Sequence, residues 1–515
     1  MLAWTIYLSF IGAGLLLLID AENRRALRTV ALLTAIAGLV IALVGVSRHD
    51  PQSGLASIAN LSWIPALGIR YQLAADGISL TLVLLTGMAA VAGILFSWNI
   101  EHRVKEFFAL YLALIGGVYG VFLSFDLFLL FVFYELAIIP KYFLIAIWGS
   151  TNKEYAAMKL ALYSFVGSAL VLIGLIAAYV VAGAHTFSLV ELAQFDFPEG
   201  FQKWAFPMVF VGFAILAGLW PFHTWAPTGH VAAPTAASML LAGVVMKLGA
   251  YGALRVAMTL FPKGLAAWQG TFAVLALIGI LYGAMVALVQ KDFKFVIGYS
   301  SVSHMGFVLL GLMTLTSIGL SGAVLQMFSH GIIAGLLFGV VGRMVYDRTH
   351  TRQLDELREM RLNKAMPFAA ISFVVAGLAS MGMPGFSGFV AELQVLMGAW
   401  KAFQTFPAFP TLAVLAGFGI LIGVAYTLRA IQKAFFSGDP EPVVGAGSEP
   451  HLAGEGAVVG EPHRFADISV PERIGAAMLM AATLAVGIYP RLLLDLIEPA
   501  LRTPLMSRLI GGGMP

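Results

Sequence analysis

The chain has 515 residues, of which 60% are hydrophobic and only 11% are charged, and its mean hydropathy is +0.91. Soluble globular domains carry about 25% charged residues because their surface faces water. This composition therefore excludes a soluble protein and predicts a chain whose surface faces lipid. The net charge of +3 is spread over single basic residues in short loops, which is not the pattern of a nucleic-acid-binding protein. The sequence has no cysteine, which excludes disulfides and cysteine-ligated iron–sulfur clusters.

Apolar runs follow one another along almost the whole chain. A spanning helix needs roughly 20 apolar residues, and the first run lacks the basic n-region and cleavage site of a signal peptide, so we expect it to be retained as a helix. We predict an all-α polytopic membrane protein of about 14 transmembrane helices. The runs fall near 2–19, 28–46, 78–98, 107–124, 125–148, 157–182, 206–228, 232–259, 269–290, 294–314, 318–346, 367–400, 410–436 and 473–492.

Two of these runs contain glycine and proline where a helix would cross the middle of the membrane. The run 206–228 contains WPFHTWAP, and the run 367–400, which is too long for one span, contains MGMPGFSGF. Broken helices are tolerated in a membrane only where they line a cavity. Interrupted helices in both halves of a chain indicate inverted repeats around a central ion path.

Basic residues predict the orientation, because the loops on the inner side of a membrane carry an excess of lysine and arginine. The bias places the N-terminus outside, and it makes 438–466, rich in Gly, Pro and Glu, an inside loop. The expected inside loops hold Arg24, Arg25, Arg28, Arg103, Lys105, Lys153, Lys291, Lys294, Arg343, Arg348, Arg352, Arg358, Arg361 and Lys364. The expected outside loops hold only Arg48, Arg70, Lys203, Lys263 and Lys401.

Charged residues inside the apolar runs are the candidate functional residues. A charge at the bilayer centre costs at least ~2.5–3.5 kcal/mol on insertion scales. Lys247 is flanked by apolar residues on both sides, and about seven residues separate it from Arg255, which we expect at the water interface. Glu392 directly follows the MPGFSGF break, where water could reach a carboxyl group. For both residues a functional role explains the insertion cost better than a structural one.

Glu135 and Lys141 lie in one predicted helix, on either side of Pro140. Six residues of regular helix leave their side chains about 120° apart, so they share a face only if the proline rotates the second half. A structural carboxyl bonded to a neighbouring helix remains an alternative for Glu135. A lysine that extends to the membrane surface remains an alternative for Lys141.

Histidines suit a relay between fixed acids and bases because they titrate near neutrality. The candidates are His223, His230, His304 and His330, although a histidine in a helix also often serves packing. No pair of them has the i, i+4 spacing of a zinc site. For Asp126 and Lys294 we favour plain structural roles, an N-cap and an anchor at the inner surface.

Six sequence stretches resemble a known family. The chain resembles the antiporter-like subunits of respiratory complex I, an NADH-quinone oxidoreductase, and within that family the chain M type. The matching stretches, over roughly residues 70 to 400, are YQLAADGISL, FYELAIIPKYFLI, PFHTWAPTGHVAAPTAASMLLAGVVMKLGAYG, IGYSSVSHMGFV, QMFSHG and MGMPGFSGFVAEL.

The resemblance implies two inverted five-helix repeats, each with a broken helix, and a proton path along the middle of the membrane. It divides the chain into residues 1–106, a first repeat over 107–259, a second over 260–436, and 437–515 with a loop and the last helix. The family's functional residues map onto Glu135, Lys247, Glu392, His223, His304 and His330. Glutamate at position 392 makes this chain similar to the M type, because the related L and N types look to carry lysine at that position.

One position departs from the family pattern. The family places a lysine seven residues before the first histidine of the broken helix, and this sequence has Leu216 there. The family pattern also shows an apolar residue where this chain has Lys141. We therefore hypothesise that Lys141 replaces the missing lysine as the partner of Glu135.

The resemblance implies a proton-translocating subunit that performs no bond chemistry itself and lies in the plasma (inner) membrane. It implies no cofactor in this chain, and it implies flavin, iron–sulfur clusters and quinone in partner subunits. The expected partners are other membrane-arm subunits, including chains L and N. Three alternatives remain: a subunit of a multisubunit cation/proton antiporter, a subunit of a membrane-bound hydrogenase, and a proton-inert scaffold.

Overall fold

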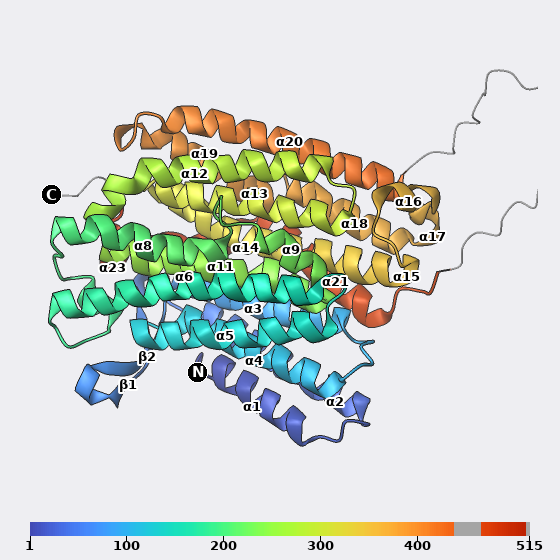
Figure 1. Ribbon diagram of the computed structural model, residues 1–515, viewed down its shortest axis with the longest axis horizontal. Coiled ribbons are helices and arrows are strands. Elements are labelled where there is room, and N and C mark those ends of the chain that lie inside the picture. Colours follow the sequence, from blue (N-terminus) through green and yellow to red (C-terminus); the bar gives the residue numbers. More distant parts are fainter. Residues whose placement is uncertain (437–464, 511–515) are drawn as a thin grey trace, which may run out of the picture.

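The long apolar runs form helices that lie side by side along one axis (Figure 1). The computed structural model describes residues 1–436 and 465–510. Within them, 12 helices are long and apolar enough to cross a membrane. These are α2 (Arg24–Arg48), α3 (Gly77–Phe96), α4 (Val104–Leu123), α5 (Leu127–Trp148), α6 (Lys153–Ala182), α8 (Glu199–Ala217), the continuous helix Thr235–Met258, α12 (Pro262–Val289), α13 (Phe293–Met313), the continuous helix Ser317–Thr349, α20 (Phe409–Phe435) and α21 (Val470–Ile488).

Two further apolar helices, α1 (Trp4–Leu18) and α18 (Pro367–Ser380), are shorter. The all-α polytopic class is therefore confirmed, whereas the count of 14 spans, the five-helix repeats and the four-part division of the chain stay predictions. Residues 437–464 and 511–515, and with them most of the expected loop 438–466, lie outside the described residues.

The two ends of the bundle differ (Figure 1). One end, the hairpin end, carries the antiparallel strands β1 (Ala56–Ile64) and β2 (Ile69–Ala75). The opposite end, the loop end, carries three short helices, α15 (Asp347–Thr349), α16 (Leu354–Glu359) and α17 (Leu362–Ala365). This hairpin is not predicted from the sequence, and Leu73 in β2 also bridges Ser124, just before α5.

The remaining short elements connect or flank the long helices. They are η1 (Pro51–Ser53), η2 (Pro65–Leu67), α7 (Leu189–Leu192), η6 (Ala402–Gln404), α22 (Arg491–Leu501) and α23 (Pro504–Ser507).

Two helices form the centre of the bundle. In the most apolar stretches of Thr235–Met258 and Ser317–Thr349 every residue is buried, compared with 28% in α2 and 33% in α6. Helices on the periphery expose large apolar side chains such as Phe165 and Leu421, as lipid-facing helices do. The two central helices approach closely at Gly331, which has no side chain. A Cβ atom at this position would lie only 2.6 Å from the carbonyl oxygen of Gly243.

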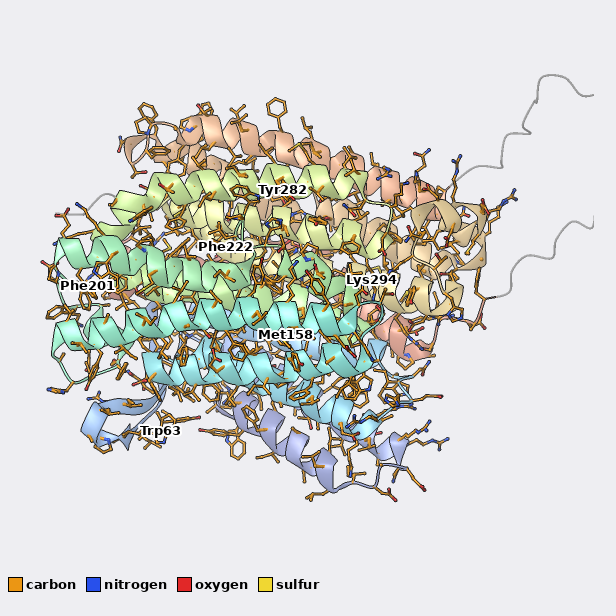
Figure 2. All side chains as sticks on the ribbon, viewed as in Figure 1. Trp63, Met158, Phe201, Phe222, Tyr282 and Lys294 are labelled. Atoms are coloured by element: carbon orange, nitrogen blue, oxygen red, sulfur yellow. The ribbon has the colours of Figure 1, made fainter. Side chains whose placement is uncertain are left out.

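Both predicted helix breaks are confirmed. α8 ends at Ala217 and α9 (Trp225–Ala232) begins after a break, and α18 ends at Ser380 before α19 (Ser387–Lys401). Gly218, Gly382 and Gly385 adopt positive φ angles of 87°, 69° and 95° in these breaks, a conformation that glycine adopts without steric cost. Figure 2 shows Phe222, in the first break, midway between Phe201 near the hairpin end and Lys294 toward the loop end.

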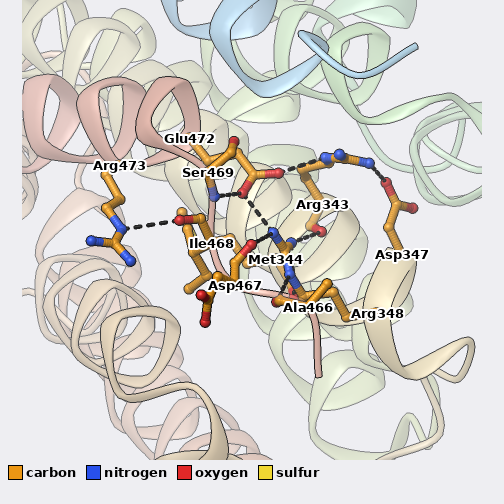
Figure 3. A network of polar contacts seen from close by, with 10 residues as sticks. All are labelled: Arg343, Met344, Asp347, Arg348, Ala466, Asp467, Ile468, Ser469, Glu472 and Arg473. Atoms are coloured by element: carbon orange, nitrogen blue, oxygen red, sulfur yellow. Dashed lines mark hydrogen bonds and ion pairs between the residues drawn. The ribbon is translucent and has the colours of Figure 1, made fainter. Parts of the chain in front are cut away.

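A polar network ties the start of α21 to the loop end of the central helix Ser317–Thr349 (Figure 3). Glu472, in the first turn of α21, is 1% exposed and accepts hydrogen bonds from Arg343 Nε at 2.6 Å and Arg348 Nη2 at 2.8 Å. It also accepts a hydrogen bond from the backbone N–H of Ser469 at 2.8 Å, and Arg343 pairs with Asp347 at 2.6 Å. The network fixes the start of α21 against η5 (Val340–Tyr346), the π-helical segment of the central helix.

Candidate functional site

Lys247 lies in the middle of a central helix and is fully buried. Its segment, α11 (Met246–Gly252), follows α10 (Thr235–Leu240) and stands between two π-helical segments, η3 (Leu241–Val245) and η4 (Ala253–Met258). Segments of π-helix are rare and occur frequently at functional sites. The Nζ atom of Lys247 donates to the carbonyl of Ala242 and lies 2.8 Å from Nδ1 of His330 on α14 (Ser317–Gly339).

His330 in turn faces His304 on α13. The centroids of their rings are 5.4 Å apart, with the ring planes inclined by 32°. A small cavity of about 10 Å³ is lined by both histidines together with Gln326 and Glu392, and a volume of this order holds roughly one water molecule. His330 Nε2 is buried and has no hydrogen-bond partner among the described residues. The two rings therefore border one space of about the size of a water molecule.

Glu392 ends this series of contacts. Its Oε1 atom lies 2.8 Å from Nδ1 of His304 and accepts a hydrogen bond from Gln326 Nε2 at 3.1 Å. Nε2 of His304 lies 3.0 Å from the hydroxyl of Ser380, the last residue of α18. A Cβ atom on Gly382 would lie 3.2 Å from Glu392 Oε2, so the glycine in the break leaves space beside the carboxyl group.

We call Lys247, His330, His304 and Glu392 the buried polar row. The four residues come from four different helices, and their exposed fractions are between 0% and 8%. All four are residues that the sequence analysis selected, and the fold places them in one line of contacts. The arrangement can pass a proton from an ammonium group through two imidazoles to a carboxylate.

The other two histidines stand apart from these contacts. His223 lies in the first helix break with its ring 5.1 Å from that of Tyr282, and both of its ring nitrogens lack a partner among the described residues. His230 is fully buried in α9, and its ring nitrogens are likewise without a partner in that part of the chain. No hydrogen bond connects either ring to the buried polar row among the described residues, although His230 lies within range of the charges of Lys247 and His330.

Glu135 and Lys141 lie on different faces of one uninterrupted helix, α5. Lys141 is fully buried, which excludes the expectation of a lysine that extends to the membrane surface, whereas Glu135 is half-buried. Lys141 Nζ and Glu135 Oε1 both lack a hydrogen-bond partner among the described residues, although each group lies within range of the other's charge. Leu216, which stands where the family pattern has a lysine, is 2% exposed in α8.

Two expectations for charged residues are wrong. Arg255, expected at the water interface, is 1% exposed and pairs with Asp76. Lys294, expected as a surface anchor, is 3% exposed because its Nζ turns inward to the carbonyl of Ala233 at 3.5 Å. The N-cap expected at Asp126 is confirmed, since its carboxylate accepts from two backbone N–H groups of α5.

Sequence reasoning missed three polar residues of the centre. Gln326 lies one turn before His330 on the same helix, so its i, i+4 spacing could have identified it. Ser380 and Asp76 carried no such signal. Their proximity to His304 and Arg255 arises from helices that are distant in the sequence.

Comparisons with known proteins identify the family of this chain. Residues 124–419 match the family model described as NADH:quinone oxidoreductase/Mrp antiporter, TM. The chain is 35% identical to NADH-quinone oxidoreductase subunit M of Rhodobacter capsulatus over 93% of this chain and 90% of that protein. It is also 35% identical to NAD(P)H-quinone oxidoreductase chain 4 3 of Picosynechococcus over 97% of this chain and 92% of that protein.

Solved structures show the same fold. A chain of respiratory complex I from Thermus thermophilus with bound NADH superposes with a TM-score of 0.84 at 28% identity, covering 99% of this chain and 100% of the other. A chain of the Mrp complex from Dietzia sp. DQ12-45-1b has a TM-score of 0.83 at 23% identity, covering 99% of each chain. The chain therefore belongs to the transmembrane family shared by NADH:quinone oxidoreductases and Mrp antiporters.

Proposed function

We propose that this chain is a proton-translocating subunit in the membrane arm of an NADH-quinone oxidoreductase. The observation that carries the proposal is the buried polar row. Within the described residues, this row connects Lys, His, His and Glu side chains through the apolar bundle. Buried ionisable residues are costly in a membrane protein and mark ion paths and proton relays. The names of the relatives favour the oxidoreductase over the antiporter.

The row accounts for proton movement step by step. The Lys247 ammonium donates to His330 Nδ1 at 2.8 Å, which frees the opposite ring nitrogen to pass its own proton into the small cavity. His304 takes up a proton at Nε2 by way of the Ser380 hydroxyl and delivers the proton on its Nδ1 to Glu392 Oε1. The row releases one proton for each proton that it takes up, so it is restored after each passage.

The Glu135–Lys141 pair is the proposed control element. The two groups are close enough to influence one another but are not hydrogen-bonded to each other, so a bend of α5 at Pro140 or a rotation of either side chain changes their interaction. Lys141 takes the place of the lysine that the family carries at the position of Leu216. Moving one charge across a membrane costs about 2.3 kcal/mol per 100 mV, and this work comes from redox chemistry in other subunits.

A cavity at the loop end offers an entrance for protons. Its volume is about 290 Å³, and it reaches the junction between α9 and α10. His230 lies in α9, before this junction, and Lys247 lies after it, on the central helix Thr235–Met258. Lining residues include Glu101, His102, Ala233, Thr235, Lys294 and Asp347.

The orientation and the partners form part of the proposal. The basic residues gather in loops at the loop end, which supports an inner, cytoplasmic position for that end and an outer position for the N-terminus and the hairpin in the plasma membrane. The chain performs no redox chemistry itself. Flavin, iron–sulfur clusters and quinone belong to other subunits, and chains L and N are the membrane-arm neighbours.

Mass spectrometry of the intact complex purified in mild detergent tests the assembly. We expect flavin- and iron–sulfur-binding subunits together with an NADH-binding chain. Copurification with hydrogenase subunits would instead make this a hydrogenase membrane arm. Recovery of hydrophobic antiporter subunits alone, with sodium-dependent proton exchange in vesicles, would replace the proposal with cation/proton antiport.

A further inference from the structure

Three buried hydroxyl groups connect three helices beside the buried polar row. The hydroxyl of Ser387, the first residue of α19, lies 2.7 Å from that of Ser329 on α14 and 2.9 Å from that of Thr483 on α21. All three side chains are completely buried, and we call them the hydroxyl chain. Two of them stand close to the row in the sequence, because Ser329 directly precedes His330 and Ser387 lies five residues before Glu392.

The needs of the individual helices do not explain the hydroxyl chain. A buried serine or threonine in a helix often donates to a carbonyl of its own helix, as Thr81 does to Gly77 in α3. A serine at the start of a helix often serves as the N-cap. In α19, however, the N-cap position belongs to Phe386, and no side chain caps the helix. The Ser387 hydroxyl is directed instead at two other helices.

The start of α19 depends on such contacts from outside. α19 follows the second helix break, in which Gly382 and Gly385 have positive φ angles of 69° and 95°. Glycine restricts the backbone less than other residues do, so the break does not by itself fix the direction of the helix that follows it. Glu392 lies on that helix. A rotation of α19 at Ser387 would therefore change the distance of 2.8 Å between Glu392 Oε1 and His304 Nδ1.

α21 contacts the break at a second point, one turn after Thr483. A Cβ atom on Gly487 would overlap the carbonyl oxygen of Gly385 and the Cα atom of Phe386, so the backbone of α21 lies directly against the break. This contact is separate from the network around Glu472. That residue lies 11 residues before Thr483 and therefore about 16 Å away along the helix.

We propose that Thr483 and Gly487 of α21 are positioning residues for Glu392, which they hold at its distance from His304 by fixing Ser387 at the start of α19. The proposal rests on the proton-translocating function above and assigns a role in it to α21. The row supplies the groups that transfer the proton, and the hydroxyl chain sets their geometry. A displacement of about 1 Å slows a reaction by roughly 100-fold, so a hydroxyl outside the row can control the rate of proton transfer.

The test uses the intact complex in proteoliposomes, with protons pumped per electron measured separately from the electron-transfer rate and from thermal stability. Thr483→Val keeps the shape of the side chain and removes its hydroxyl, whereas Thr483→Ser keeps the hydroxyl and removes a methyl group. We expect Thr483→Val to slow proton transfer through this chain roughly 10-fold or more, which lowers the protons per electron toward the value of Lys247→Met. Thr483→Ser should keep the wild-type ratio, because it retains the bond to Ser387.

Matched variants separate positioning from general damage to packing. Thr81→Val removes an equally buried hydroxyl that donates within its own helix, and Glu472→Gln loosens α21 at its other end. Both should keep the wild-type ratio. Gly487→Ala should lower the ratio by pushing α21 away from the break. Gly417→Ala, in which the added Cβ atom meets nothing within 4 Å, should leave it unchanged.

Each outcome decides the proposal. A wild-type ratio in Thr483→Val, while Lys247→Met lowers it, overturns the positioning role and leaves the proposed function intact. Equal decreases in Thr483→Val and Thr483→Ser also overturn that role, because the position then matters through its packing. A wild-type ratio in Lys247→Met overturns the proposed function itself. If Thr483→Val fails to assemble, Ser329→Ala decides, because it removes the hydroxyl at the other end of the chain. A lowered ratio in Ser329→Ala supports the proposal, and a wild-type ratio overturns it.

Discussion

Lys247 and His330 stand 83 positions apart in the sequence, yet the Nζ of one lies 2.8 Å from the Nδ1 of the other at the centre of the bundle. Both belong to helices whose apolar stretches are completely buried. The contact joins the two halves of the molecule at the point where each contributes an ionisable side chain. From this contact we can predict which substitutions stop proton transfer.

Replacing Lys247 by methionine should abolish proton transfer through this subunit, because the row loses its first donor while its volume is nearly kept. Lys247→Arg should fail as well, although it keeps the charge, because a guanidinium does not release its proton in proteins. Loss of a positioned proton-transfer group slows such steps by roughly 100-fold or more. Fluorescence quenching of a pH-sensitive dye in proteoliposomes measures the effect. Lys203→Met, which removes an exposed ion pair with Glu199, is the control and should pump normally.

Glu392→Gln should assemble but transfer protons poorly. The amide retains hydrogen-bonding capacity toward His304 and Gln326 but cannot take up a proton as the carboxylate does. Glu392→Asp should recover part of the activity because it restores the titrating group at a greater distance. The protons pumped per electron are the measurement. A wild-type ratio in Glu392→Gln would show that the row ends before this residue.

Glu472→Gln provides the matched case of a buried glutamate outside the row. Its carboxylate holds Arg343 and Arg348 at 2.6 and 2.8 Å (Figure 3), and breaking such a buried pair costs on the order of 3 kcal/mol. We expect a lower thermal stability of the purified complex, followed by light scattering. The protons pumped per electron should stay unchanged in the fraction that assembles. A lowered ratio at unchanged stability would contradict this assignment.

Lys141→Met should abolish pumping if Lys141 is the partner of Glu135. The variant leaves the half-buried Glu135 carboxyl group without a cation, and a carboxyl group in an apolar environment takes up a proton instead of switching. Adding Leu216→Lys to Lys141→Met should restore part of the pumping, because it returns a cation to the position usual in the family. Normal pumping by Lys141→Met would refute the relocation of this lysine.

Gly331→Ala should weaken the Lys247–His330 contact by forcing the central helices apart. The added Cβ atom would lie 2.6 Å from the Gly243 carbonyl and 2.6 Å from Leu85 Cδ1, and overpacking of this kind costs about 1–3 kcal/mol. Slower pumping together with lower thermal stability is the expected result. Gly335→Ala, one turn along the same helix, meets nothing closer than 3.8 Å. It should behave like the wild-type chain in both measurements.

Much of this molecule is determined by the local sequence. Helix existence follows from apolar runs of sufficient length, since a membrane offers the backbone no hydrogen-bond partner outside the helix. The first break follows from Gly218 and the second from the glycines and the proline of MGMPGFSGF, because these residues disfavour the helical conformation. The candidate residues Lys247 and Glu392 follow from the cost of charge in an apolar run. All of these signals lie within about 30 consecutive residues, which is the reach of a periodicity or composition argument.

Which of those residues meet was decided only by the tertiary structure. The row from Lys247 through His330 and His304 to Glu392 requires four helices to present one side chain each to the same point, and helix order along the chain does not specify helix rotation. The same limit explains the wrong expectation for Arg255. Its sequence position suggested a water interface, but Asp76, at the start of a distant helix, neutralises its charge and allows it to be buried. Long-range pairing of charges is a property of packing, so the sequence alone determined the inventory of ionisable groups and the fold determined their connection.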